Sequence, residues 1–98
     1  MSTVLVFRRI ARIEFDEAAD WYERRQAGLG PRFVFAVQRV LDRIAEQPDF
    51  YPVVHGEVRE ALVQRFPFCI YYREEAAQIL VLAVFHTSRE PSIWQGRT

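Results

Sequence analysis

One histidine and several arginines stand at the predicted ends of strands, where a fold can bring side chains together for chemistry. His86 ends the longest apolar run, which begins at Ile79, and Arg89 follows three residues later. Arg59 lies in an earlier strand-like segment, and Arg65 begins the RFPF link after it. An imidazole can move a proton, and guanidinium groups can stabilise the charge that develops on a phosphodiester. These four residues are therefore candidates for a nucleolytic site.

A structural role is the competing interpretation of the same residues. Arg59 and Arg65 can pair with their acidic neighbours Glu57 and Glu60, or with the acidic residues of the first predicted helix. His86 can bind backbone groups that are left free at the end of a strand. Spacing alone favours this structural interpretation.

Other kinds of active site find little support. The single cysteine, Cys69, lies among apolar residues of a predicted strand, where a thiol is usually buried and inert. A nucleophilic pair of Cys69 and His86 is therefore disfavoured. Neither His55 nor His86 has a cysteine or a second histidine at ligand spacing, and no glycine-rich phosphate loop is present. We expect no metal and no cofactor.

The composition is that of a globular protein. The chain has 98 residues, of which 50% are hydrophobic and 27% charged, and residues 1–98 fit one domain. A lone cysteine suits a reducing cytosol. The apolar runs are too short for a membrane span, and the N-terminal one is too short for a signal peptide. We expect a cytoplasmic protein that does not associate with membranes.

The charges narrow the possible ligands. Thirteen basic and thirteen acidic residues balance, and every basic residue is an arginine. No lysine is present to act as a base or to form a Schiff base, so an anion must be held by guanidinium groups. Zero net charge also argues against tight, non-specific binding of nucleic acid.

Hydrophobic spacing predicts the elements that position these residues. Residues 3–8 alternate weakly, as a strand does. Helical stripes follow on both sides of a break at residues 27–31, and a proline- and glycine-rich loop covers residues 48–57. Three strand candidates complete the chain at residues 58–63, 68–73 and 78–86. The predicted fold is α+β: an N-terminal strand, an antiparallel helical hairpin, and three antiparallel strands forming a small twisted sheet.

Some apolar residues find no place in that predicted core. The strand at residues 79–85 is apolar at every position, which is typical of a strand covered on both faces, yet the helices cover only one. Phe35 lies about 200° around its helix from Phe33, and Trp21 lies beside the stripe of the first helix. These residues are either satellite core contacts or apolar surface for a partner, which includes a second copy of the chain.

The order of motifs resembles the RelE/ParE toxin superfamily of bacterial type II toxin–antitoxin modules. Over residues 11–97 the chain carries, in sequence, WYE, GLG..F, P..YP, R..L..RFPF.IYY and AV.H..R.P..W, which are specific as a set. The resemblance implies a helical hairpin against an antiparallel sheet. It also implies an antitoxin, an otherwise disordered segment of which covers apolar surface of the toxin. Four side chains are our candidates for contact with a partner: Trp21, Phe35, Phe85 and Trp94.

Activities differ within that superfamily. RelE-like members are ribosome-dependent mRNA endonucleases, whereas ParE-like members inhibit DNA gyrase. The nuclease branch uses basic residues that include lysines, an arginine at the position of Cys69, and often a tyrosine at the position of Trp94. These departures favour a ParE-like toxin that acts by binding gyrase. A RelE-like nuclease that uses His86 and arginines is the alternative, and a toxin fold that has lost its toxicity is a third.

Overall fold

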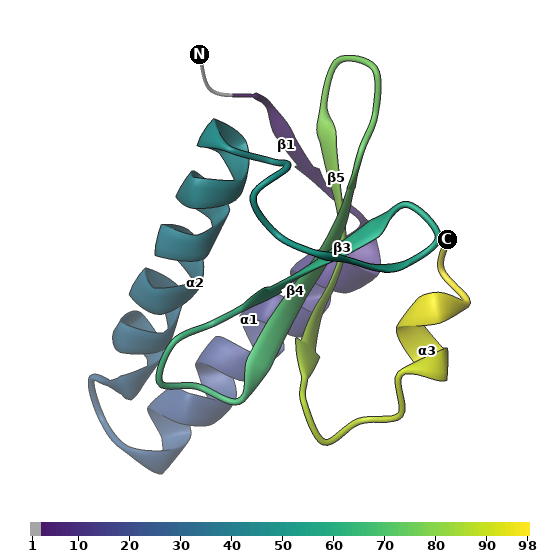
Figure 1. The fold of residues 1–98 in the computed structure, drawn as a ribbon. Helices are drawn as coiled ribbons and strands as arrows, with labels where there is room; N and C mark the ends of the chain where they lie inside the picture. Colours follow the sequence, from purple (N-terminus) through teal and green to yellow (C-terminus); the bar gives the residue numbers. More distant parts are fainter. Residues whose placement is uncertain (1–2) are drawn as a thin grey trace.

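Five strands form one sheet in the computed structural model, which describes residues 3–98, and two long helices cover one face of this sheet (Figure 1). The fold confirms the predicted α+β class. In chain order the elements are β1 (Leu5–Phe7), α1 (Arg9–Arg25), α2 (Leu29–Glu46), β2 (Val53–His55), β3 (Val58–Leu62), β4 (Phe68–Glu74), β5 (Ile79–His86) and α3 (Ser92–Gln95).

The sheet has the order β1-β5-β4-β3-β2. Strands β3, β4 and β5 form an antiparallel meander, and Phe68 of β4 lies opposite His86 of β5. The first strand pairs in parallel with the last, with Leu5 opposite Ile79. A parallel pair needs a long crossover connection, and the helical hairpin begins this crossover. The most apolar strand, β5, therefore lies inside the sheet along its first three residues.

The turn between α1 and α2 depends on two glycines. Gly28 has a φ of 89°, in the left-handed region that favours glycine. The Glu23 carboxylate accepts hydrogen bonds from the backbone N–H groups of Gly28 (3.0 Å) and Gly30 (2.9 Å), which occupies two N–H groups at the start of α2. A Cβ atom on Gly30 would lie 2.9 Å from the carbonyl oxygen of Ala19, so the two helices cross at close range.

The main core lies between the helices and the sheet. Phe15 of α1 and Phe33 of α2 meet edge to face, with 6.1 Å between ring centroids, and both are buried against Tyr72 and neighbouring strand residues. The Tyr72 hydroxyl donates to the carbonyl oxygen of Pro48 at 2.6 Å, so the one polar atom of this side chain is satisfied.

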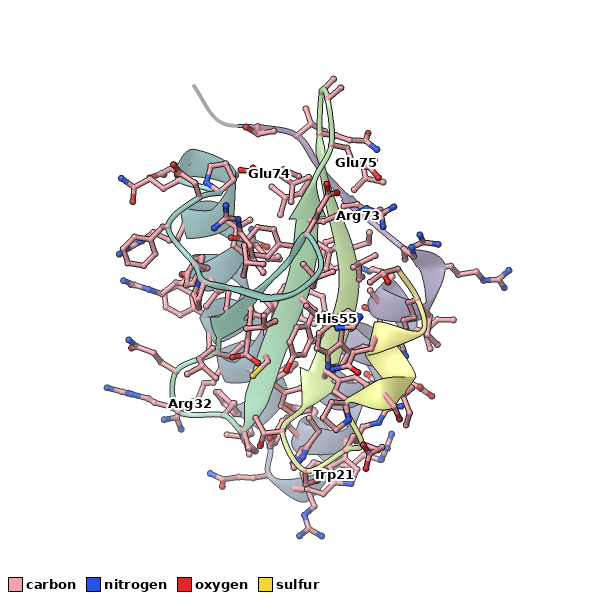
Figure 2. All side chains as sticks on the ribbon, turned by 45° about the vertical axis from the view of Figure 1, so that its right-hand side comes forward. Trp21, Arg32, His55, Arg73, Glu74 and Glu75 are labelled. Atoms are coloured by element: carbon pink, nitrogen blue, oxygen red, sulfur yellow. The ribbon has the colours of Figure 1, made fainter. Side chains whose placement is uncertain are left out.

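The second face of the sheet is covered by the C-terminal segment of the same chain. The Trp94 indole of α3 stacks on the Tyr71 ring, with 3.9 Å between centroids and 15° between planes, and Val58, Leu82 and Phe85 complete this cluster. His55 meets Trp94 edge to face near the same helix (Figure 2). The expectation that the chain's own helices cover only one face is thus wrong, because a four-residue helix is too short to show periodicity in the sequence.

Two further predictions need correction. The N-terminal strand covers Leu5–Phe7 instead of residues 3–8. The predicted loop at residues 48–57 contains the edge strand β2, in which Val53 lies opposite Arg59. All three residues of β2 are exposed, so no alternation of apolar and polar residues marks the strand. Within the described residues, no helix is long and apolar enough to cross a membrane.

Candidate functional site

The four basic candidate residues do not form one cluster. His86 lies opposite Phe68, whereas Arg59 lies opposite Tyr72, four residues further along β4. At the usual rise of a strand, four residues correspond to roughly 13 Å. The Arg59 guanidinium donates to the carbonyl oxygens of Tyr51 (2.6 Å) and Asp49 (3.3 Å). Arg59 therefore holds the loop before β2 in place.

Arg89 is bound to a buried carboxylate that the sequence pattern did not single out. Glu14 of α1 is 9% exposed. Its Oε2 accepts hydrogen bonds from Arg89 (2.8 Å) and from Arg97 Nη2 (2.9 Å). Its Oε1 accepts hydrogen bonds from Arg97 Nη1 (3.0 Å) and from the backbone N–H of Val84 (3.1 Å). We call Glu14, Arg89 and Arg97 the Glu14 clamp.

The clamp closes an open edge of the sheet. Among the described residues, strand β1 pairs with the first three residues of β5, as far as Val81, so the polar backbone groups beyond Val81 lack a strand partner on that side. Glu14 satisfies the N–H of Val84, and Arg97 donates to the carbonyl oxygen of Leu82 at 3.1 Å. In the sequence, Glu14 falls between Ala11 and Ala18 on the apolar stripe of α1. An acidic residue on the side of a helix that faces the core was the signal that could have identified Glu14 as a buried carboxylate.

Phe85 and Trp94, two of the predicted partner contacts, are covered by the chain itself. They are 2% and 3% exposed. The guanidinium carbon of Arg89 lies 4.2 Å from the Phe85 ring centroid, and that of Arg97 lies 5.7 Å from it. A partner that contacts Phe85 or Trp94 must first displace the C-terminal segment. The two other predicted contacts, Trp21 and Phe35, are exposed by 47% and 63%.

Trp21 and His86 line the same hollow, although one is on α1 and the other ends β5. The hollow measures about 370 Å³, and its remaining lining comes from Ala18, Tyr22, Pro67 and Phe68. The rings of Trp21 and Tyr22 are 5.1 Å apart, and those of Phe68 and His86 are 5.2 Å apart. Figure 2 shows Trp21 at the end of the molecule away from Glu75 of the β4–β5 hairpin. We call this feature the Trp21–His86 hollow.

The orientation of the His86 ring is fixed by Ser88. His86 Nδ1 accepts the backbone N–H of Ser88 at 3.0 Å and lies 2.7 Å from the Ser88 hydroxyl. Because Nδ1 acts as an acceptor, the neutral ring carries its proton on Nε2. His86 can therefore offer one N–H donor to a bound group.

Positive charge lies beside the hollow. The Arg25 guanidinium carbon is 4.7 Å from the Trp21 ring centroid, a cation–π contact. Arg65 is exposed in the turn that leads to Pro67, and its φ of 71° is in a region that few residues other than glycine adopt. Across residues 3–98, neither arginine has a carboxylate within ion-pair distance. The surface can thus accept a flat or apolar group that carries negative charge.

The side chains of Cys69 and His86 face opposite sides of the sheet. Cys69 belongs to the buried cluster around Trp94, on the face covered by α3, whereas His86 lines a hollow beside α1. Burial raises the pKa of the Cys69 thiol, and the nearby Glu60 carboxylate raises it further. Within the part of the chain that the structure describes, no three side chains of the metal-binding types gather at one point.

Comparison with known proteins identifies the family. The model of the "ParE toxin of type II toxin-antitoxin system, parDE" matches residues 5–91 of this chain. The chain belongs to the ParE toxin family. A solved structure described as "Chromosomal ParDE TA system from P. aeruginosa" has the same fold, with a TM-score of 0.66 and 19% sequence identity over 89% of this chain and 98% of that one. No curated protein sequence matches this chain.

Proposed function

We propose that this ParE-family chain is a cytoplasmic toxin that inhibits bacterial growth by binding DNA gyrase, and that a cognate antitoxin neutralises it. The observation that carries the proposal is the contrast between the arginines proposed for catalysis and the residues that line the Trp21–His86 hollow. The nuclease candidates Arg59 and Arg89 are engaged by backbone carbonyls and by Glu14. The Trp21–His86 hollow is open and aromatic, and Arg25, which stacks on Trp21, has no ion-pair partner within residues 3–98.

A binding inhibitor needs such a surface and needs no acid–base pair. An exposed tryptophan beside an arginine is the kind of residue pair that dominates the energetics of protein–protein contacts. The alternative, an mRNA endonuclease, is favoured by one observation: in the described structure, His86 Nε2 has no hydrogen-bond partner. The two functions therefore make opposite demands on His86 and Trp21.

Induction of variants in bacteria tests the proposal. Trp21→Ala is expected to lose growth inhibition, because it removes the main apolar wall of the hollow. His86→Gln is expected to keep most of it, because glutamine still offers an N–H donor but cannot act as an acid or base at neutral pH. A nuclease predicts the reverse pattern.

Phe50→Ala is the matched control. Phe50 is 59% exposed and stacks with Arg43 at 5.0 Å, much as Trp21 stacks with Arg25, but it lies in the loop before β2. Its loss should leave growth inhibition intact. If Trp21→Ala stays as toxic as Phe50→Ala while both accumulate to wild-type levels, the hollow is not the target-binding surface.

A further inference from the structure

The described residues that line the Trp21–His86 hollow are aromatic or apolar, and none of them is acidic. Three rings and two small apolar residues form its walls, and His86 completes the lining. Burial raises the pKa of the Tyr22 phenol, so this ring stays protonated and uncharged. Glu17 adjoins Ala18 in the chain and is exposed, but it does not line the hollow. The lining therefore contributes no negative charge.

Two groups at the hollow can bind an electronegative atom of an occupant. Because His86 Nδ1 accepts a hydrogen bond from Ser88, Nε2 carries the ring proton, and this N–H has no acceptor within residues 3–98. The Arg25 guanidinium lies 4.7 Å from the Trp21 ring centroid and has no carboxylate within ion-pair distance in the described structure. A neutral donor and a cation on an aromatic surface are complementary to a carboxylate that adjoins an aromatic group.

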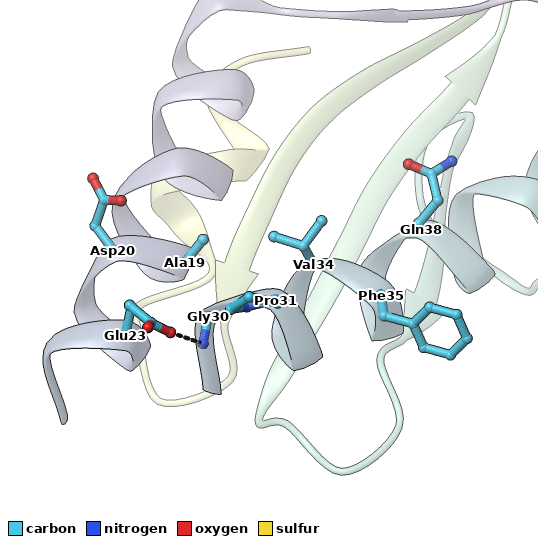
Figure 3. Close-up of a pocket in the computed structure, with 8 residues that line it drawn as sticks. All are labelled: Ala19, Asp20, Glu23, Gly30, Pro31, Val34, Phe35 and Gln38. Atoms are coloured by element: carbon cyan, nitrogen blue, oxygen red, sulfur yellow. Dashed lines mark hydrogen bonds between the residues drawn. The ribbon is translucent and has the colours of Figure 1, made fainter. Parts of the chain in front are cut away.

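The groove between α1 and α2 is a useful comparison. This groove is larger, about 690 Å³, and Phe35, which lines it, is 63% exposed (Figure 3). The Arg39 guanidinium carbon lies 5.9 Å from the Phe35 ring centroid, so a similar pair of arginine and aromatic ring is present. However, the carboxylates of Asp20 and Glu23 line this groove. Of the two concave surfaces, only the hollow offers an arginine and an aromatic lining without a lining carboxylate.

We infer that the Trp21–His86 hollow holds an aromatic side chain that directly adjoins a carboxylate. The aromatic ring would pack against Trp21, and the carboxylate would accept a hydrogen bond from His86 Nε2 while Arg25 supplies positive charge beside it. The hollow measures about 370 Å³, near the lower limit of ligand sites, so a single side chain suits it better than a large ligand does. Because the occupant is assigned to the target protein, this assignment rests on the proposed function.

A nucleotide is the competing occupant, since a base can also stack on tryptophan. Surfaces that bind single-stranded nucleic acid combine aromatic rings with a positively charged groove that follows the phosphates. Here the whole chain has zero net charge, and none of the described residues that line the hollow is an arginine. One cation in contact with the lining suits one carboxylate better than a chain of phosphates.

Titration of the purified chain with N-acetylphenylalanine, followed by NMR, tests the inference. This probe carries an aromatic ring beside a free carboxylate, and N-acetylphenylalaninamide is its neutral counterpart. The Trp21 indole N–H signal and the His86 ring signals should shift, with a dissociation constant of roughly 1 mM for a probe of this size. The indole signal of Trp94, which is 3% exposed and packs against the other face of the sheet, should stay in place. The amide should bind about threefold more weakly or less tightly still, because it lacks the charge.

Substitutions separate the contributions to binding. Trp21→Ala should abolish saturable binding of both probes, as read from the His86 ring, whereas the matched control Phe35→Ala should change neither. His86→Phe keeps an aromatic ring but removes the donor, so it should weaken both probes about threefold or more, since both offer an acceptor oxygen. Arg25→Gln should weaken only the carboxylate, so that the two probes bind almost equally. Arg24→Gln, at the exposed neighbouring arginine, should leave their ratio unchanged.

Three results would overturn the inference: equal affinity of the wild-type chain for the carboxylate and the amide, tighter binding of adenosine 5′-monophosphate at these signals, or no shift of Trp21 and His86 up to about 20 mM probe. The titrations contain no gyrase, so they fail separately from the proposed function. A chain that binds the probe but leaves supercoiling untouched contradicts the proposed target and supports the chemistry assigned to the hollow. A chain that blocks supercoiling but does not bind the probe overturns the inference alone.

Discussion

The Glu14 clamp is predicted to be a principal source of stability, and Glu14→Gln is the substitution that tests it. Glutamine keeps the size of the side chain but removes its charge. In the folded protein Glu14 accepts hydrogen bonds from Val84, Arg89 and Arg97. After the substitution, two guanidinium groups lose the carboxylate that neutralises them.

The magnitude follows from the exposure of each partner. Breaking a buried ion pair by removing one partner costs about 3–5 kcal/mol, whereas an exposed pair contributes about 0–1 kcal/mol. The Arg97 side chain is 13% exposed and that of Arg89 is 41% exposed, so the Arg97 contact carries most of the effect. We expect Glu14→Gln to lower the free energy of unfolding by about 2–4 kcal/mol, or the Tm by roughly 10–25 °C for a domain of this size.

Urea and thermal unfolding measure this loss. Glu17→Gln is the matched control, because Glu17 is an exposed carboxylate one turn further along α1, and its change should stay within about 0.5 kcal/mol. In a Trp21→Phe background, the fluorescence of Trp94 reports separately on release of the C-terminal segment. A Glu14→Gln loss no larger than the control would refute the reasoning that this carboxylate anchors Arg97 and the edge of β5.

Three further predictions concern buried groups and close packing. Burial raises the pKa of Tyr71 and of Tyr72, so at alkaline pH the unfolded chain releases phenolic protons that the folded chain retains. The free energy of unfolding should therefore fall as the pH rises above about 10. Tyr72→Phe should make this fall less steep in urea titrations at increasing pH, and an unchanged slope would contradict the prediction. The Cys69 thiol should react with a disulfide reagent at least about a hundredfold more slowly in the folded than in the unfolded chain, because Cys69 is 3% exposed and the pKa of its thiol is raised. Similar rates in the two states would show that β4 opens readily. Gly30→Ala should lower the free energy of unfolding by about 1–3 kcal/mol, since the new Cβ would lie 2.9 Å from a backbone oxygen. Gly96→Ala is the control and should be nearly neutral, because its Cβ would lie 3.6 Å from the nearest backbone oxygen. Equally small losses for the two variants in thermal unfolding would mean that the helices separate at little cost.

The elements with strong periodicity were predictable from the sequence. The apolar stripes of the two helices and the long apolar strand at residues 79–85 locate α1, α2 and β5 within one or two residues. The elements that escaped prediction are short. Strand β2 has three exposed residues and α3 has four residues, so tertiary contacts with β3 and with Tyr71 determine them more than local pattern does.

The candidate site was predictable only in part. The sequence marked Trp21 as lying off its helix stripe and His86 as ending a strand, but only the fold shows that they line one hollow. It marked Arg89 as a catalytic candidate, whereas its partner Glu14 lies 75 residues away in the chain. Local spacing can mark Glu14 as an acidic residue on the apolar stripe of α1, but it does not identify the distant arginines with which the carboxylate pairs.

The central claim is that this toxin binds its target and does not cut RNA. The most direct measurement adds the purified chain to a DNA gyrase supercoiling reaction and, in parallel, to ribosomes translating a defined mRNA. The account predicts that supercoiling stops in the first reaction, that Trp21→Ala relieves the block, and that the mRNA in the second stays intact. Cleavage of the mRNA at the ribosome, with gyrase unaffected, would contradict it.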